Sequence, residues 1–114
     1  MEIYKGRRLT IEKSLFLLPN GYQREAVVVR PSGAVVILPI EGQHCYLIRQ
    51  WRFVINQYIL EAPAGTMEAG EDPLETAHRE LIEEAGFAAG ELIPRGFIYT
   101  TPGFTDERIF IYEA

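Results

Sequence analysis

Acidic side chains are concentrated in one short part of the chain, residues 65–87, which reads GTMEAGEDPLETAHRELIEEAGF. The segment holds seven Asp and Glu residues and one arginine, whereas the whole chain of 114 residues has a net charge of only −5. On a helix, Glu80, Glu83 and Glu84 stand at i, i+3 and i+4, and such carboxylates can converge on Mg²⁺ or Mn²⁺. A cation there would neutralise phosphate charge and help to ionise an attacking water, so the pattern indicates phosphoanhydride hydrolysis.

The alternative for the same residues is a solvated helix face. Arg79 lies four residues from both Glu75 and Glu83, and each such pair stabilises a helix by about 0.2–0.5 kcal/mol. Glu80 and Glu84 instead form a like-charge pair at the same spacing, in the half of the helix where the macrodipole disfavours negative charge. A solvated face therefore explains Glu75 and Glu83, but it leaves Glu80 and Glu84 unexplained.

The sequence predicts one helix, and it carries these acids. Asp72 is the expected N-cap, Pro73 suits the first helical position, and Glu75 completes a capping box. Gly86 is expected to end the helix in the left-handed conformation. Apolar residues at helical spacing form the expected core-facing stripe, which consists of Leu74, Ala77, Leu81, Ile82 and Ala85.

The remainder of the chain has the residue alternation and turn signals of strands. Asn20-Gly21 separates two such runs, residues 10–18 and 22–30, and predicts a hairpin between them. A second hairpin is predicted from residues 34–40 and 44–52. Further strands are expected over residues 57–61, 91–100 and 107–112.

Length and composition indicate one globular domain that binds neither nucleic acid nor membrane. The chain is 47% hydrophobic and 24% charged, and its net acidity argues against nucleic-acid binding. It has no apolar run long enough to span a bilayer, and its first residues lack the apolar core of a signal peptide. The single cysteine, Cys45, is expected in the core, and the cysteine count favours the cytoplasm.

The acidic segment resembles the Nudix box, G-x5-E-x7-R-E-U-x-E-E-x-G-U, where U is a bulky aliphatic or aromatic residue. The nine restricted positions match without departure at Gly65, Glu71, Arg79, Glu80, Leu81, Glu83, Glu84, Gly86 and Phe87. The resemblance implies an α+β fold, namely a Nudix α/β/α sandwich with a mixed β-sheet and a catalytic loop-helix-loop, in a single domain over residues 1–114. It also implies that Glu80, Glu83 and Glu84 hold divalent cations, and that Glu71 pairs with Arg79 to orient the site.

Three further segments resemble the ADP-ribose pyrophosphatases of this family. They are RQWR at residues 49–52, EAPAG at 61–65 and TTPGFTDE at 100–107. The resemblance implies hydrolysis of ADP-ribose to AMP and ribose 5-phosphate, with Mg²⁺ or Mn²⁺ as the cofactor. The alternatives are a hydrolase of another nucleoside diphosphate derivative, such as a nucleotide sugar, and a non-catalytic module that binds such a nucleotide.

The same resemblance implies roles for residues outside the box. The carbonyl of Ala64 becomes a metal ligand, and Arg52 becomes a contact to the phosphates or the terminal ribose, as suits an arginine. The wall near the terminal ribose is expected to consist of Pro102, Gly103, Phe104 and Glu107. The competing interpretations are a solvated edge-strand charge for Arg52 and an ordinary turn for Pro102-Gly103. Trp51, Phe53 and Tyr58 are expected either to stack on adenine or to be buried.

The two ends of the chain give two further expectations. Related enzymes are commonly homodimers with shared sites, so the N-terminal strands within residues 1–30 are expected to contribute to a dimer. The sequence stops at Ala114, whereas related enzymes continue through a further strand and a second helix, and in several that region supplies a glutamate base or metal ligand. Either the chain is a fragment or another group serves as base, for which Glu83 is the nearest candidate.

Overall fold

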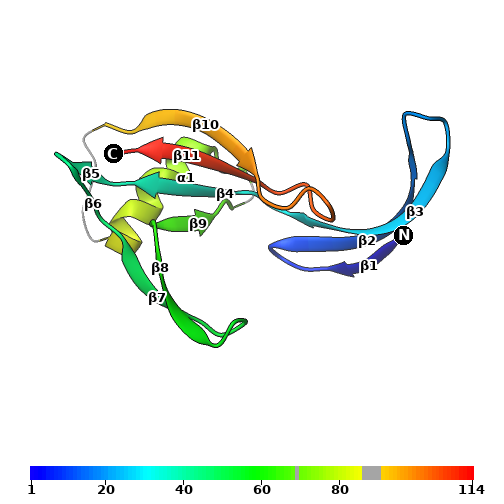
Figure 1. The fold of residues 1–114 in the computed structure, drawn as a ribbon, viewed down its shortest axis with the longest axis horizontal. Coiled ribbons are helices and arrows are strands. Elements are labelled where there is room, and N and C mark those ends of the chain that lie inside the picture. The colour runs from blue at the N-terminus through cyan, green and yellow to red at the C-terminus, as the bar shows by residue number, and fades with distance from the viewer. Residues whose placement is uncertain (69, 86–90) are drawn as a thin grey trace.

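A computed structural model describes residues 1–68, 70–85 and 91–114. A central four-stranded sheet packs against one helix, and a three-stranded sheet and a two-stranded ribbon project from this body (Figure 1). The strand order in the central sheet is β10 (Ile93–Tyr99), β11 (Arg108–Glu113), β4 (Ala34–Leu38) and β9 (Ala64–Thr66). β11 and β4 are parallel and the other two pairs are antiparallel, so the sheet is mixed.

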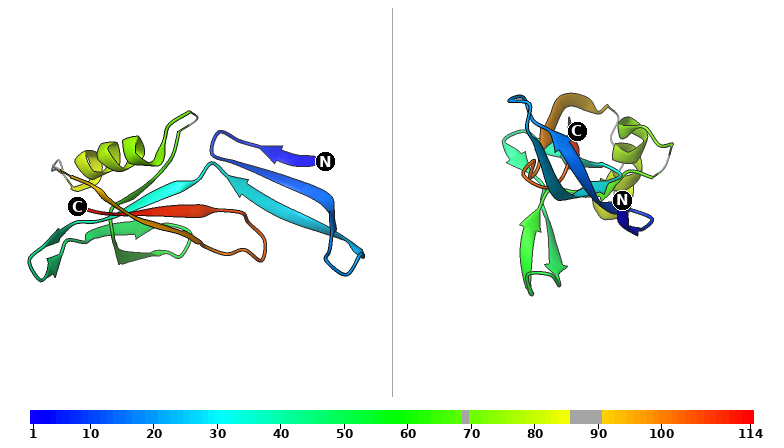
Figure 2. Two further views of the ribbon diagram at one scale, coloured as in Figure 1. Left: turned by 90° about the horizontal axis from the view of Figure 1, so that it is seen from above. Right: turned by 90° about the vertical axis from the view of Figure 1, so that its right-hand side faces the viewer.

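The core lies between β4 and the helix. Val35 and Ile37 of β4 are fully buried and cluster with Ala77 and Leu81, which are also fully buried. Burying a Val, Ile or Leu side chain stabilises a fold by about 1.5–3 kcal/mol each. Because β4 sits between β11 and β9, this contact fixes the helix over the middle of the sheet (Figure 2).

The helix begins as the sequence predicts. α1 (Pro73–Glu80) has Asp72 as its N-cap, and the backbone N–H of Glu75 donates to Asp72 Oδ1 at 3.0 Å. The chain then continues as a π-helical turn, η1 (Leu81–Ala85). Gly86, the expected C-terminal residue, lies outside the described residues.

The predicted apolar stripe is only partly correct. Ala77 and Leu81 are fully buried, as expected, whereas Leu74 is 44% and Ile82 55% exposed. The wider π turn changes the angular spacing that places a stripe on one face, which accounts for Ile82. Leu74 lies in the first turn, at the exposed end of the helix.

A three-stranded antiparallel sheet forms the N-terminal part of the molecule. Its strands are β1 (Glu2–Lys5), β2 (Leu9–Leu17) and β3 (Gln23–Pro31), in that order. The β2–β3 hairpin confirms the prediction from Asn20-Gly21, and Gly21 has the positive φ of 88° that its turn requires. This sheet extends away from the central sheet (Figure 1).

The second predicted hairpin is wrong over most of its length. Only the short strands β5 (Ile40–Glu41) and β6 (His44–Cys45) pair across the turn. β4 joins the central sheet instead, and β7 (Ile48–Arg52) pairs with β8 (Gln57–Glu61) to form a projecting ribbon. The long-range partners β11 and β9 bury β4, and this burial outweighs the local turn signal.

The molecule is elongated, with extents of 51 × 31 × 27 Å and a radius of gyration of 16.8 Å. A compact domain of this length has a radius of gyration of about 13 Å. The difference arises because the N-terminal sheet and the β7–β8 ribbon project from the body (Figures 1 and 2). Cys45 is exposed on β6, so its expected place in the core is wrong. Trp51, Phe53 and Tyr58 are exposed on the ribbon, which rules out burial within this chain and leaves stacking on adenine as a prediction.

The α+β class with a mixed sheet is confirmed. Of the implied α/β/α layers, the described residues form the sheet and the helical layer on one of its faces (Figure 2). Among the described residues, no helix has the length and apolar character needed to cross a bilayer.

Candidate active site

Arg79 is the centre of an ion-pair network that joins the loop before the helix to the acids on the helix. Its Nε and Nη2 atoms donate to Glu71 Oε2 and Oε1 at 3.0 and 2.8 Å. The Glu71 carboxylate also accepts from Thr76 Oγ1 at 2.6 Å and from the backbone N–H of Glu68 at 3.1 Å. These donors, Arg79 foremost, lower the pKa of Glu71 from 4.5 to about 2. The Glu71–Arg79 pairing expected from the sequence is therefore present.

The same guanidinium reaches the helix acids. Arg79 Nη1 donates to Glu80 Oε1 at 2.7 Å and lies 3.5 Å from Glu83 Oε2. Its Nη2 also donates to the carbonyl oxygen of Thr66 on β9, at 3.3 Å. The i,i+4 ion pair with Glu75, which the solvated-face interpretation requires, is not among the ion pairs of the described residues. Arg79 thus ties the helix to β9.

The Glu80 side chain packs directly against the backbone of β9 at Gly65, where glycine leaves room for it. Glu80 is only 8% exposed, and a Cβ at residue 65 would overlap its carboxylate. Glycine is the residue that allows such a close approach to a backbone. The first glycine of the acidic segment is thereby explained by packing, not by a turn.

Glu84 faces the cleft from the π turn. Its Oε2 accepts a hydrogen bond from Gln50 Nε2 on β7 at 3.1 Å. Burial raises the pKa of Glu84, the neighbouring Glu80 raises it further, and a hydrogen bond from the backbone of Ala64 acts in the opposite direction. Two carboxylates in this arrangement favour a bound cation, because a cation removes their repulsion.

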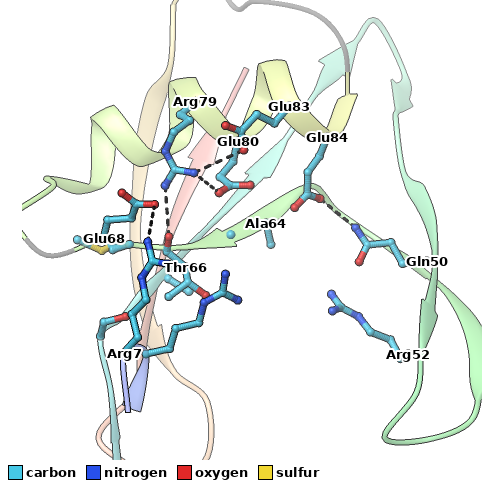
Figure 3. A pocket seen from close by; sticks show the side chains of 15 residues that line it. Arg7, Gln50, Arg52, Ala64, Thr66, Glu68, Arg79, Glu80, Glu83 and Glu84 are labelled. Carbon is cyan, nitrogen blue, oxygen red and sulfur yellow. Dashed lines mark hydrogen bonds and ion pairs between the residues drawn. The ribbon is translucent and has the colours of Figure 1, made fainter. Parts of the chain in front are cut away.

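Arg79, the three helix glutamates and Gln50 line one cleft of about 800 Å³. Figure 3 shows Glu80, Glu83 and Glu84 on the helix side of the cleft, with Ala64 and Thr66 of β9 behind them and Gln50 and Arg52 of β7 across from Glu84. The lining residues are Arg7, Arg8, Ser32, Ala34, Gln50, Arg52, Ala64, Gly65, Thr66, Met67, Glu68, Arg79, Glu80, Glu83 and Glu84.

The donors fit a hard divalent cation in chemistry. The three glutamates and the backbone of Ala64 offer only oxygen ligands, which Mg²⁺ and Mn²⁺ prefer. As they stand, no three acidic, histidine or cysteine side chains of the described residues converge closely enough to hold an ion. Glu80 and Glu83 turn towards Arg79, and Glu84 turns towards Gln50.

Arg52 lies in this cleft but is engaged by a neighbour. Its Nε and Nη2 atoms donate to Glu61 Oε2 and Oε1 at 2.6 and 2.5 Å across the β7–β8 ribbon. This pairing raises the pKa of Arg52 and lowers that of Glu61. A substrate contact by Arg52 stays a prediction.

The loop of residues 100–107 does not reach the glutamates within one chain. Pro102, Gly103 and Phe104 line a second cleft, of about 400 Å³, together with residues of β2 and β3. The backbone N–H of Val29 on β3 donates to the carbonyl oxygen of Phe104 at 2.8 Å. Glu107 accepts from Thr100 Oγ1 at 2.8 Å within the loop.

A protein-family model for the NUDIX domain matches residues 29–114, which contain the helix, the cleft carboxylates and the whole central sheet. The chain belongs to the Nudix family. The match begins within β3, so β1 and β2 lie outside it. The Nudix box is the segment 65–87. Its residues 69, 86 and 87 lie outside the described part of the chain.

Two of the three similar proteins that follow are named for hydrolysis of ADP compounds, and the third is named as an activator of another enzyme. The ADP-ribose pyrophosphatase of Bacillus subtilis (strain 168) is 36% identical over 99% of this chain and 62% of its own length. The methanol dehydrogenase activator of Bacillus methanolicus is 37% identical over 99% of this chain and 62% of its own length. A crystal structure of an ADP compounds hydrolase superposes on this chain with a TM-score of 0.83 at 31% identity. The match covers 100% of this chain and 63% of the chain in the crystal structure. The chain thus spans about three fifths of the length of these Nudix relatives.

Sequence reasoning missed several residues that line the Nudix cleft or support its acids. Gln50 lies in the RQWR segment, but its bond to Glu84 depends on how the β7–β8 ribbon folds back. Thr76 anchors Glu71 from inside the helix. Arg7 and Arg8 come from the β1–β2 turn, and the only signal for them was a pair of arginines after a glycine.

Proposed function

We propose that the protein hydrolyses the diphosphate bond of ADP-ribose to AMP and ribose 5-phosphate, in a reaction that depends on a divalent metal. The observation that carries the proposal is that Glu80, Glu83 and Glu84 line the same cleft as Arg52 and Gln50. Carboxylates on one wall and an arginine on another suit a metal-bound diphosphate. The names of the relatives support ADP-ribose as the substrate that carries this diphosphate.

Mg²⁺, with Mn²⁺ as a substitute, is the proposed cofactor. Glu80, Glu84 and the carbonyl of Ala64 would hold it, and Glu83 would assist through the metal or through a water. When bound, the metal neutralises phosphate charge and lowers the pKa of the attacking water. Water adds across one P–O bond, so the two products each leave with one phosphate.

The remaining residues position these groups. Arg79 and Glu71 hold the helix acids against β9, and Gln50 orients Glu84. Glu83 is 58% exposed in its side chain and is the proposed base for the attacking water. Arg52 would exchange part of its pairing with Glu61 for the substrate phosphates.

We also propose that the protein is a homodimer. Large apolar side chains are exposed on the N-terminal sheet, among them Ile3, Leu15, Leu17 and Val27, and a dimer would cover such a surface. In that assembly, the loop of residues 100–107 would have to reach the partner's cleft for Pro102, Gly103, Phe104 and Glu107 to contact the terminal ribose.

A Glu84→Gln variant tests the metal site. Loss of a residue that merely supports a metal ligand typically costs 10–100-fold, so loss of this ligand should lower turnover of ADP-ribose by at least about 100-fold. Glu75→Gln is the matched control, because Glu75 is exposed on the same helix and does not line the cleft. Near-normal turnover by Glu84→Gln would refute the metal assignment.

A substrate panel separates the alternatives. Faster turnover of a nucleotide sugar than of ADP-ribose would favour a hydrolase of another nucleoside diphosphate derivative. The name of the similar crystal structure, ADP compounds hydrolase, is compatible with that alternative. Tight binding of ADP-ribose without metal-dependent product would favour a binding module.

A further inference from the structure

The β1–β2 turn brings two arginines, Arg7 and Arg8, into the lining of the catalytic cleft. The turn is closed by a hydrogen bond from the N–H of Gly6 to the carbonyl oxygen of Leu9 at 2.8 Å. A second bond, from the N–H of Ser32 to the carbonyl oxygen of Arg8 at 2.9 Å, ties the turn to the segment that enters β4. The backbone therefore holds both arginines beside the cleft.

The chain itself satisfies little of their charge. Arg7 Nη2 lies 3.9 Å from Glu68 Oε1, and the two side chains are 86% and 63% exposed, so solvent screens the pair and leaves it weak. Arg8 forms no ion pair with the described residues. Arg52 and Arg79, in contrast, each donate two hydrogen bonds to one glutamate.

The two arginines lie where a bound diphosphate needs positive charge. Figure 3 shows Arg7 on the side of the cleft away from the helix that carries Glu80, Glu83 and Glu84. A diphosphate held by a cation on those carboxylates presents its other non-bridging oxygens to the opposite side. Guanidinium groups bind phosphate oxygens through parallel charge-assisted hydrogen bonds.

We propose that Arg7 and Arg8 form a phosphate subsite, which binds the non-bridging oxygens of the diphosphate on the side opposite the glutamates. The inference rests on the proposed function, because it takes a diphosphate as the ligand. It gives the N-terminal sheet a direct part in the site of its own chain, although β1 and β2 lie outside the matched NUDIX range. Ligand binding then bridges the β1–β2 turn and the helix.

Calorimetry with two non-hydrolysable probes tests the subsite in the presence of Mg²⁺. The probes are an ADP-ribose analogue with a methylene bridge between its phosphorus atoms, and methylenediphosphonate itself. A hydrogen bond to a charged group contributes about 1.5–3 kcal/mol, so Arg7→Ala and Arg8→Ala should each raise the Kd for both probes about 10- to 100-fold. Arg→Lys at either position should recover part of the loss, because it keeps the charge but not the planar fork.

Lys5→Ala is the matched control. Lys5 is an exposed cation on β1, beside the turn, and it does not line the cleft. Its removal changes the net charge equally and should leave both Kd values unchanged. A comparable loss in Lys5→Ala would show a general charge effect and overturn the subsite.

The two probes separate this inference from the proposed function. If the unmodified protein binds both probes and the Arg7→Ala/Arg8→Ala double variant binds them equally well, the subsite is overturned and the function stands. If the unmodified protein binds methylenediphosphonate but not the ADP-ribose analogue, and the arginine variants weaken that binding, the subsite stands and ADP-ribose is the wrong substrate. Binding of neither probe overturns both.

Discussion

The Glu71 carboxylate is the best-supported acid of the site, although it does not line the cleft. It accepts four hydrogen bonds, two from Arg79, one from Thr76 and one from the backbone of Glu68. Its pKa of about 2 records this support. Glu84, in contrast, has a raised pKa because it is partly buried beside another acid. One acid is thus stabilised as an anion by the protein, and the other by whatever cation it binds.

Glu71→Gln should make the stability of the protein less dependent on acid pH. The folded-state pKa of Glu71 lies below the ordinary value of 4.5, so its contribution is fully present above about pH 4.5 and is lost as the pH falls towards 2. Urea unfolding at a series of pH values should show the variant less stable than the unmodified protein at pH 7, with the difference shrinking below pH 4.5. A difference that is constant over this range would contradict the assigned network.

At the residue scale, the sequence predicted that Arg79 pairs with Glu71 and Glu83, but not the contacts that Glu80 and Glu84 make. The spacing of Glu80, Glu83 and Glu84 was sufficient to predict that they share one helical segment, and all three line the same cleft. The Arg79–Glu80 bond was not expected, since i,i+1 residues do not face each other on a regular helix. It forms because Glu80 packs over Gly65 on β9, a contact between distant segments that local spacing does not encode.

At the element scale, β9 and the helix determine the geometry of the site. β9 is only three residues long and was not predicted, because its sequence AGT has no strand pattern of its own. It exists through pairing with β4. The hairpin with the Asn-Gly turn and the N-cap of the helix were predictable, since their signals are local. The parallel β4–β11 pair was not, since it joins residues 34–38 to residues 109–113.

Gly65→Ala should damage the site through this contact between elements. The added Cβ overlaps the Glu80 carboxylate, so Glu80 must move. Misplacement of about 1 Å costs roughly 100-fold in rate, and overpacking costs about 1–3 kcal/mol of stability. Turnover and urea unfolding measure the two effects.

A double-mutant cycle provides the control for this prediction. In a Glu80→Ala background the obstructing carboxylate is gone, so Gly65→Ala should cost little further stability. An equal cost in both backgrounds would show that the new methyl group acts elsewhere on β9.

At the scale of the whole molecule, the proposed homodimer would account for both the elongated shape and the exposed apolar side chains. The core of the described residues is small, and residues such as Leu15 and Leu17 on β2 are 63% and 75% exposed. Binary patterning cannot identify such residues in advance, because a strand face that is buried by a partner has the same sequence pattern as one buried by its own domain.

Light scattering should therefore give a mass twice the 13.0 kDa of one chain. The Leu15→Glu/Leu17→Glu double variant should shift the mass towards one chain, because it replaces two exposed apolar side chains of β2 with charges. Leu74→Glu is the control, since Leu74 is 44% exposed on the helix. A monomeric mass for the unmodified protein at micromolar concentration would refute the dimer.

The most direct test of the central claim is to incubate residues 1–114 with ADP-ribose and Mg²⁺, and to follow AMP by chromatography. We expect AMP and ribose 5-phosphate in equal amounts, with no product when a chelator removes the metal. That result would establish that these residues contain a sufficient Nudix site, including its base. A folded sample that forms no AMP with either Mg²⁺ or Mn²⁺ would contradict the assignment.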